Sequence, residues 1–151
     1  MSPIIDPPAE AVGIDGIEKI IKENSLIKAY KDGKDKEARW NMMMASTEGA
    51  MAFSKGLGAV HSMSHATGAN QELRLHHGTL NAVILPAVLE FNQNHVGNKY
   101  SRIARAMGKN ESINLANEIR KLNENIGIPS GLAEMGVTEA VSYTHLRAHE
   151  T

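Results

Sequence analysis

The chain has 151 residues, a formal net charge of −1 and no cysteine, which suits one domain and excludes disulfide frameworks and thiolate metal sites. No long basic run occurs, so neither nucleic acid nor a membrane surface is expected as a partner. No apolar stretch reaches the roughly 18 residues of a membrane span, and no signal region follows Met1. We therefore expect a cytoplasmic protein.

The residue pattern predicts helices and little else. The first helix is expected to open at Pro7, because proline is tolerated at a helix start, and to end at Asn24. Residues 31–35 form a predicted turn, and Asp35 is placed to cap a second helix over about residues 36–54. The methionines of that helix are expected to fill the core.

Glycine and proline divide the middle of the chain. Gly56 and Gly58 are expected to end the second helix before a short helical segment, and residues 66–75 are expected to form a loop. A helix from residue 78 to about 92 is expected to kink near Pro86, because proline removes an intrahelical hydrogen bond.

The last predicted helices lie between residues 100 and 126. A short helix is expected to end at Gly108, and Asn110 or Ser112 would cap a longer one. The predicted buried stripe of that longer helix is Leu115, Ile119, Leu122 and Ile126. Aromatic residues make up only 4% of the chain while Met and Ala are frequent, which favours close helix packing over a sheet core. The predicted fold class is all-α, a helical bundle.

Four of the seven histidines fall within residues 61–77, among small and apolar residues. His61 and His65 are four apart, so a helix places them on one face. His77 precedes a glycine and a second apolar run. Two helices that offer imidazoles to one cleft can build a metal site, since neutral imidazole suits Fe, Zn and Ni.

Two motifs in this order carry a resemblance to a known family. Gly58-Ala-Val-His61-x-x-x-His65 and His77-Gly78-x-x-Asn81-Ala-x-x-Leu85-Pro86 resemble the signature of iron-containing (group III) alcohol dehydrogenases. Residues 37–46, 53–58 and 127–137 also read like that family's helical C-terminal domain. The resemblance runs from about residue 2 to 139 and implies the dehydroquinate synthase-like fold.

The resemblance implies a metal-dependent oxidoreductase. Family members bind one divalent metal through an aspartate and three histidines, and they interconvert small alcohols and aldehydes with NAD(P). It implies that His61 and His77 are metal ligands and that His65 lines the substrate and nicotinamide pocket as a catalytic and cofactor-binding residue. The family's motif could also be aligned with His76 as the ligand in place of His77. The motif histidine is followed by a glycine, and Gly78 directly follows His77, so the resemblance favours His77. Asn81 is expected to cap its helix or to hydrogen-bond a ligand.

The metal implied by the resemblance is Fe²⁺, or Zn²⁺, because histidine-rich sites accept both. The chain has no Asp-x-x-x-His and no glycine-rich dinucleotide turn. Residues 1–140 are therefore expected to be an incomplete helical metal-binding domain. Its absent N-terminal partner domain would bind most of the NAD(P). The isolated chain is expected to be inactive, and the full-length enzyme to form homo-oligomers.

Residues 141–151 resemble the translation of a sequencing adapter rather than any part of the family. They are expected to form a non-native or disordered tail. His145 and His149 are four apart in this tail, and we do not interpret them as a second metal site, because this spacing without a third ligand is usually chance.

Two other classes of function stay open from the residues. In the first, the chain is a self-contained helical metal-binding module without redox activity, in which Glu48, Glu72 or Glu90 completes a site with His61 and His77. In the second, the domain serves only in subunit contacts.

Overall fold

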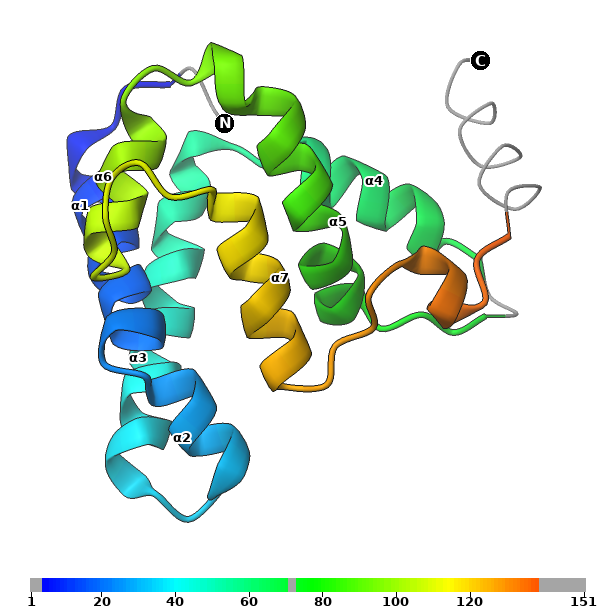
Figure 1. Cartoon of the computed structure of the whole chain (residues 1–151), viewed down its shortest axis with the longest axis horizontal. Coiled ribbons are helices and arrows are strands. Elements are labelled where there is room, and N and C mark those ends of the chain that lie inside the picture. The colour runs from blue at the N-terminus through cyan, green and yellow to red at the C-terminus, as the bar shows by residue number, and fades with distance from the viewer. Residues whose placement is uncertain (1–3, 71–72, 139–151) are drawn as a thin grey trace. The chain divides into compact units, whose positions relative to one another are not determined.

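The computed structural model describes residues 4–70 and 73–138, and all its regular elements within those residues are helical, which confirms the predicted all-α class (Figure 1). In chain order the elements are α1 (Pro7–Ile17), the π-helical turn η1 (Glu18–Lys22), α2 (Ser25–Lys31), α3 (Lys36–Met51), η2 (Ala52–Lys55), α4 (Ala59–Gly68), α5 (His77–Asn92), η3 (Gln93–His95), α6 (Lys99–Ala106), α7 (Leu115–Asn125) and η4 (Leu132–Met135). No helix in the described ranges has the length and apolarity needed to cross a membrane.

The chain divides into two compact units. The first unit comprises Met1–Gly56 with Gln93–Asn114, and the second comprises Leu57–Asn92 with Leu115–Thr151. The predicted tail, residues 141–151, and its two histidines lie outside the described residues.

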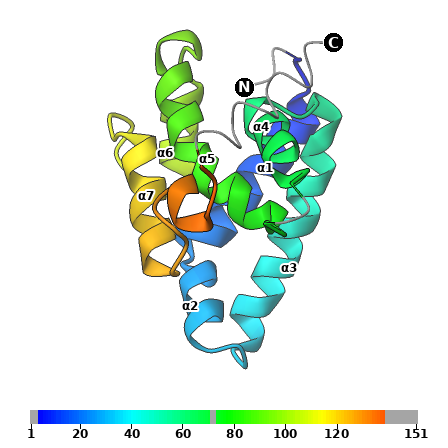
Figure 2. The same ribbon diagram turned by 90° about the vertical axis from the view of Figure 1, so that its right-hand side faces the viewer.

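In the first unit, α1 packs on α3, while α2 and α6 lie against α3 and α1 respectively. Figure 2 shows α2 turning back into α3. Both long helices begin with a carboxylate cap: Asp6 accepts from Ala9 N at 3.1 Å, and Asp35 accepts from Ala38 N at 3.0 Å. The predicted Asp35 cap is confirmed, because a cap depends on residues only three positions apart.

The prediction missed α2, which follows the first helix after a sharp break. Asn24 adopts the left-handed conformation, with φ of 59°, and Ser25 starts the new helix at once. Asparagine tolerates this conformation better than most residues, so it can end one helix and begin the next without a loop. Ser25 is buried, and its hydroxyl accepts from Asn41 Nδ2 at 3.1 Å.

The expectation that the α3 methionines fill the core is wrong for two of the four, and the other two, Met42 and Met44, are half-buried. Met43 and Met51 are 63% and 59% exposed, whereas Ala38 and Ala45 are buried. A Cβ added at Gly16 of α1 would lie 3.5 Å from the Ala45 carbonyl oxygen, so the two helices meet backbone to backbone. Small residues permit that approach and long methionines do not.

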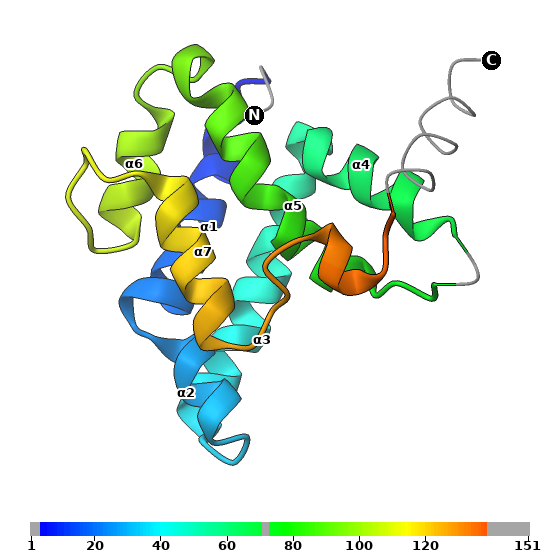
Figure 3. The same ribbon diagram turned by 45° about the vertical axis from the view of Figure 1, so that its right-hand side comes forward.

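In the second unit, α4 and α7 both pack on α5, and η4 also contacts α5 (Figures 1 and 3). Helix α4 continues to Gly68, so the predicted loop at residues 66–75 starts later than expected. The core is built around Leu80 and Ile84 of α5 and Leu115 and Ala116 of α7.

Helix α5 runs through Pro86 without ending there. Proline has no backbone N–H, so it leaves the carbonyl of Ala82, four residues earlier, without its helical donor. The side chain of Asn123, buried on α7, donates from Nδ2 to Ala82 O at 2.8 Å. The lost helical bond is thereby replaced by a bond between helices.

Helix α7 begins at Leu115, later than predicted. Asn110 accepts at Oδ1 from the backbone N and the hydroxyl of Ser112, so it closes the preceding turn rather than the helix. Gly127 follows the helix with φ of 70°, a conformation that suits glycine, which confirms the predicted stop.

Candidate functional site

Three histidines of the second unit lie together where α4 meets the start of α5. The ring centroids of His65 and His77 are 4.9 Å apart, those of His61 and His77 are 5.5 Å apart, and those of His61 and His65 are 6.1 Å apart. We call these three residues the histidine cluster. The helical spacing of the first two and the N-terminal position of the third on α5 bring the rings to one place.

Two glycines precede the start of α4, and His76 precedes the start of α5. Gly56 has φ of 77°, which ends η2, and Gly58 precedes α4 in an extended conformation. His76 turns to the first turn of α5, where its Nδ1 accepts from Thr79 N at 3.3 Å. Thus His77, and not the adjacent His76, belongs to the histidine cluster.

Asn81, one turn after His77 on α5, contacts two rings of the cluster. Its Nδ2 lies 3.1 Å from His77 Nε2 and 3.5 Å from His61 Nε2. Its Oδ1 is buried and has no hydrogen-bond partner among the described residues. Two ring nitrogens therefore point to one small region that the Asn81 amide also reaches, so the sequence expectation of a side-chain bond to a candidate ligand is met in geometry.

Ser64 was missed by the sequence reasoning. It is fully buried on α4, and its Oγ lies 3.1 Å from the carbonyl oxygen of His61 and 3.4 Å from His77 Nδ1. Its position between His61 and His65 was the only available signal. A serine in the middle of a helix gives no hint of a partner thirteen residues later.

The histidine cluster favours neutral imidazole at His61. Burial lowers the pKa of His61 below its usual value of 6.5, and the neighbouring His77 and His65 lower it further. A neutral ring keeps a lone pair, which is the form that ligates metals.

The described residues do not form a complete metal site by themselves, since no three His, Cys, Asp or Glu side chains among them are arranged to hold an ion. Glu48 pairs with Lys19 at 3.0 Å, and Glu90 binds Arg120 at 2.6 and 2.9 Å. Glu72 lies outside the described residues. The donor chemistry of His61 and His77 fits a divalent ion, yet a firm site needs at least three protein ligands.

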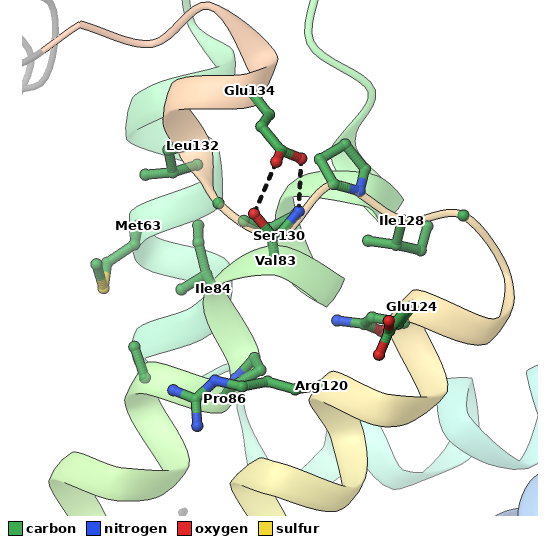
Figure 4. Close-up of a pocket in the computed structure, with 15 residues that line it drawn as sticks. Met63, Val83, Ile84, Pro86, Arg120, Glu124, Ile128, Ser130, Leu132 and Glu134 are labelled. Carbon is green, nitrogen blue, oxygen red and sulfur yellow. Dashed lines mark hydrogen bonds between the residues drawn. The ribbon is translucent and has the colours of Figure 1, made fainter.

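The second unit also contains an open cavity of about 730 Å³ that involves no histidine (Figure 4). Its walls come from α4, α5, α7 and the segment through η4, and include Met63, Val83, Ile84, Pro86, Ile128 and Leu132. Polar groups at its edge are engaged: Arg120 binds Glu90, and Glu134 accepts from the N–H and hydroxyl of Ser130. The histidine cluster is therefore the stronger candidate site.

Residues 6–148 match the family described as "Fe-containing alcohol dehydrogenase family, C-terminal". The match extends into the tail, so it does not by itself separate residues 141–151 from the domain.

Two characterised relatives are similar over about nine-tenths of this chain. A 4-hydroxybutyrate dehydrogenase from Cupriavidus necator is 43% identical over 92% of the chain and 38% of its own length. An NADPH-dependent butanol dehydrogenase from Clostridium saccharobutylicum is 39% identical over 91% of the chain and 35% of its own length. The chain thus spans little more than a third of these relatives.

The fold of the chain is similar to that of solved structures as well. An alcohol dehydrogenase from Oenococcus oeni superposes with a TM-score of 0.84 at 28% identity. The superposition covers 97% of this chain and 40% of that one.

Proposed function

The chain belongs to the iron-containing alcohol dehydrogenase family, and on that premise we propose that it supplies part of the metal site of an NAD(P)-dependent alcohol dehydrogenase or aldehyde reductase. The full-length enzyme would be a cytoplasmic homo-oligomer that acts on small alcohols and aldehydes. The isolated chain would be inactive, because it spans little more than a third of its relatives and has neither an Asp-x-x-x-His motif nor a glycine-rich dinucleotide turn.

In this proposal His61 and His77 are metal ligands through Nε2. An aspartate and a further histidine from the remainder of the enzyme complete the set around Fe²⁺ or Zn²⁺. A bound divalent ion supplies Lewis-acid chemistry at the substrate oxygen, and the nicotinamide supplies the hydride chemistry.

The chain's own residues orient the ligands and handle the proton. His65 is exposed to solvent next to His77, with the two ring centroids 4.9 Å apart, so it is placed to relay a proton or to contact the nicotinamide. Asn81 and Ser64 hold the two nitrogens of the His77 ring.

One observation carries the proposal. The Nε2 atoms of His61 and His77, from different helices, both lie within 3.5 Å of the Asn81 amide nitrogen and so face a common region. His77 is exposed and His61 is half-buried, so core packing alone does not require the two rings to meet there. The alternative of a self-contained metal-binding module is weaker, because no His, Cys, Asp or Glu among the described residues completes a site with these two rings.

A chimera tests the proposal. The full 151-residue chain replaces the matching segment of the Cupriavidus necator 4-hydroxybutyrate dehydrogenase, which is 43% identical to it. We expect the chimera to oxidise 4-hydroxybutyrate with a nicotinamide cofactor, and the isolated chain to be inactive with short alcohols and either NAD or NADP.

The matched variants are His61→Ala and His95→Ala in the same chimera. His95 lies exposed in η3, outside the histidine cluster. Loss of activity and of bound metal only in the His61 variant supports the proposed ligand. If the His61 variant kept both its activity and its bound metal, His61 would not be a metal ligand.

A further inference from the structure

Ser64 lies where it can control the proton on His77. The side chain is fully buried, and it sits between the carbonyl oxygen of His61, 3.1 Å from Oγ, and the His77 ring, whose Nδ1 is 3.4 Å from Oγ. A hydroxyl has one hydrogen to donate. The His61 carbonyl can only accept, and it lies nearer to Oγ than Nδ1 does, so we assign that hydrogen to the carbonyl.

The proton count then fixes the state of the His77 ring. With its hydrogen given to the carbonyl, Ser64 Oγ can only accept from Nδ1, so Nδ1 must carry a hydrogen. A neutral imidazole has one N–H, which leaves the lone pair on Nε2.

Asn81 leads to the same assignment from the other side of the ring. Its Nδ2 carries two hydrogens and no lone pair for accepting, and it lies 3.1 Å from His77 Nε2. Nε2 must therefore be the acceptor. The opposite tautomer would require the Ser64 hydroxyl to leave the His61 carbonyl and the Asn81 amide to turn over.

We propose that Ser64 is a positioning residue that holds His77 as the Nδ1–H tautomer, so that Nε2 keeps its lone pair toward the region shared with His61. In the metal-free chain the Asn81 amide caps that lone pair. The consequence for metal affinity rests on the proposed function, whereas the tautomer itself does not. Partners of this kind, which hold a ligand histidine by its second nitrogen, tune metal affinity by about 10–100-fold.

The test is nitrogen NMR of the imidazole rings in the full chain, labelled with nitrogen isotope and recorded above the pKa range of histidine. Long-range proton–nitrogen correlations distinguish the two tautomers of each ring. We expect His77 to be protonated on Nδ1 in the wild type. A His77 ring protonated on Nε2 overturns the inference without the need for any variant.

Ser64→Ala removes the acceptor, and Ser62→Ala is its matched control. Ser62 lies on the same helix but is exposed, and its hydroxyl donates to the Gly58 carbonyl rather than to a histidine ring of the described residues. We expect Ser64→Ala to move His77 toward the Nε2–H tautomer, and Ser62→Ala to leave the ring unchanged. An unchanged ring in a folded Ser64→Ala chain overturns the role of Ser64.

A titration of the same samples with Zn²⁺ separates this inference from the proposed function. We expect about 10-fold weaker Zn²⁺ binding by Ser64→Ala than by the wild type and Ser62→Ala. Two imidazoles bind Zn²⁺ weakly, so the titration runs to a large excess of Zn²⁺. A wild-type chain that has the Nδ1–H tautomer but shows no effect of this excess on His61 or His77 contradicts the proposed metal ligands and leaves the tautomer standing. Equal Zn²⁺ affinity in all three chains overturns the effect of Ser64 on the metal.

Discussion

The two units of the chain bury polar groups in opposite ways. In the first unit, the buried Glu48 binds Lys19 at 3.0 Å, and Lys19 also binds Asp15. In the second, two neutral side chains, Ser64 and Asn81, contact the rings of the histidine cluster. Charges that are compensated inside a unit serve its packing. Ring nitrogens that face each other beside neutral groups keep lone pairs of the kind that ligate metals.

The pKa values follow the same division. The ammonium of Lys19 is the main cause of the lowered pKa of Asp15, and the carboxylate of Asp15 is the main cause of the raised pKa of Lys19. In the histidine cluster, burial and like charge lower the pKa of His61. The first arrangement favours the charged forms and the second favours the neutral form, which a metal ligand needs.

The largest expected effect is on metal binding by the histidine cluster. His77→Ala should weaken Zn²⁺ binding by the full chain by about 100-fold, since a ligand contributes more than the groups that support it. Glu48→Gln in the first unit should leave the affinity unchanged. Calorimetric titration measures both, and a comparable loss in the Glu48 variant would end the distinction between the two units.

The next effect concerns the neutral bond between Asn123 and the Ala82 carbonyl. Asn123→Ala should lower the free energy of unfolding by about 1–3 kcal/mol, because a buried acceptor loses its donor. In a Pro86→Ala background, the new backbone N–H can donate to the Ala82 carbonyl, so Asn123→Ala should lower the free energy of unfolding by less. Urea denaturation of the wild type, the two single variants and the double variant gives this double-mutant cycle. An equal loss of stability from Asn123→Ala in both backgrounds would show that Asn123 does not replace the helical bond lost at Pro86.

In the first unit, substitutions at the two glycines of α1 test how closely this helix packs against α3 and its buried Glu48. A Cβ at Gly16 would lie 3.2 Å from Glu48 Oε2, while one at Gly13 would lie 3.6 Å from Ala52 Cβ, an ordinary contact. Gly16→Ala should destabilise by about 1 kcal/mol, because the ion-paired carboxylate resists displacement. Gly13→Ala should stabilise by up to about 1 kcal/mol through helix propensity.

A second substitution identifies the cause of the Gly16 effect. Glu48→Ala removes the carboxylate, so Gly16→Ala should become neutral or favourable in that background. Thermal unfolding of the single and double variants measures the difference. A Gly16 cost that persists without the carboxylate would assign the strain to the backbone of α3 instead.

The two units should lose stability in different ranges of pH. A hydrogen bond from Lys55, and a weaker effect of one from Arg102, lower the pKa of Glu10 from 4.5 to about 2. The contribution of Glu10 to the stability of the fold is therefore complete above pH 4.5 and is lost as the pH falls from 4.5 to 2. His61 binds a proton less readily in the folded chain, so its contribution is lost as the pH falls below 6.5.

Separate probes can follow the two losses. Trp40, the one tryptophan of the chain, lies on α3 and reports the first unit, while the NMR signals of His65 and His77 report the second. Glu10→Gln should flatten only the Trp40 profile below pH 4.5, and His61→Gln should flatten only the profile of those two histidines below pH 6.5. If both probes show the same single transition in the wild type and in both variants, Glu10 and His61 do not set the acid stability of the two units separately.

The smallest expected effect belongs to an ion pair that is not buried. Arg120 and Glu90 form two hydrogen bonds, but their side chains are 45% and 44% exposed. Arg120→Ala should cost less than about 1 kcal/mol, and high salt should reduce that cost further. If urea denaturation shows a loss of several kcal/mol, the two well-aligned hydrogen bonds contribute more to the free energy of unfolding than the exposure of the pair predicts.

Much of the fold is predictable because its signals are local. The Asp35 cap and the stop at Gly127 depend on contacts a few residues apart or on one backbone conformation. The pattern failed at α2 because Asn24 both ends and starts a helix within one residue. It failed on the buried face of α3 because apolar residues occur on both sides of that helix, and only the partner α1 selects the small ones.

The candidate site divides in the same way. By itself the sequence determined the all-α class, the family and the two motifs that carry His61 and His77, since helical spacing and motif order are properties of the chain alone. Only the tertiary structure decided that Ser64 and Asn81 hold opposite nitrogens of His77 and that Asn123 replaces the bond lost at Pro86. Asn123 and Ala82 are 41 residues apart, and hydrogen bonds of that kind depend on where two helices meet, which no local pattern specifies.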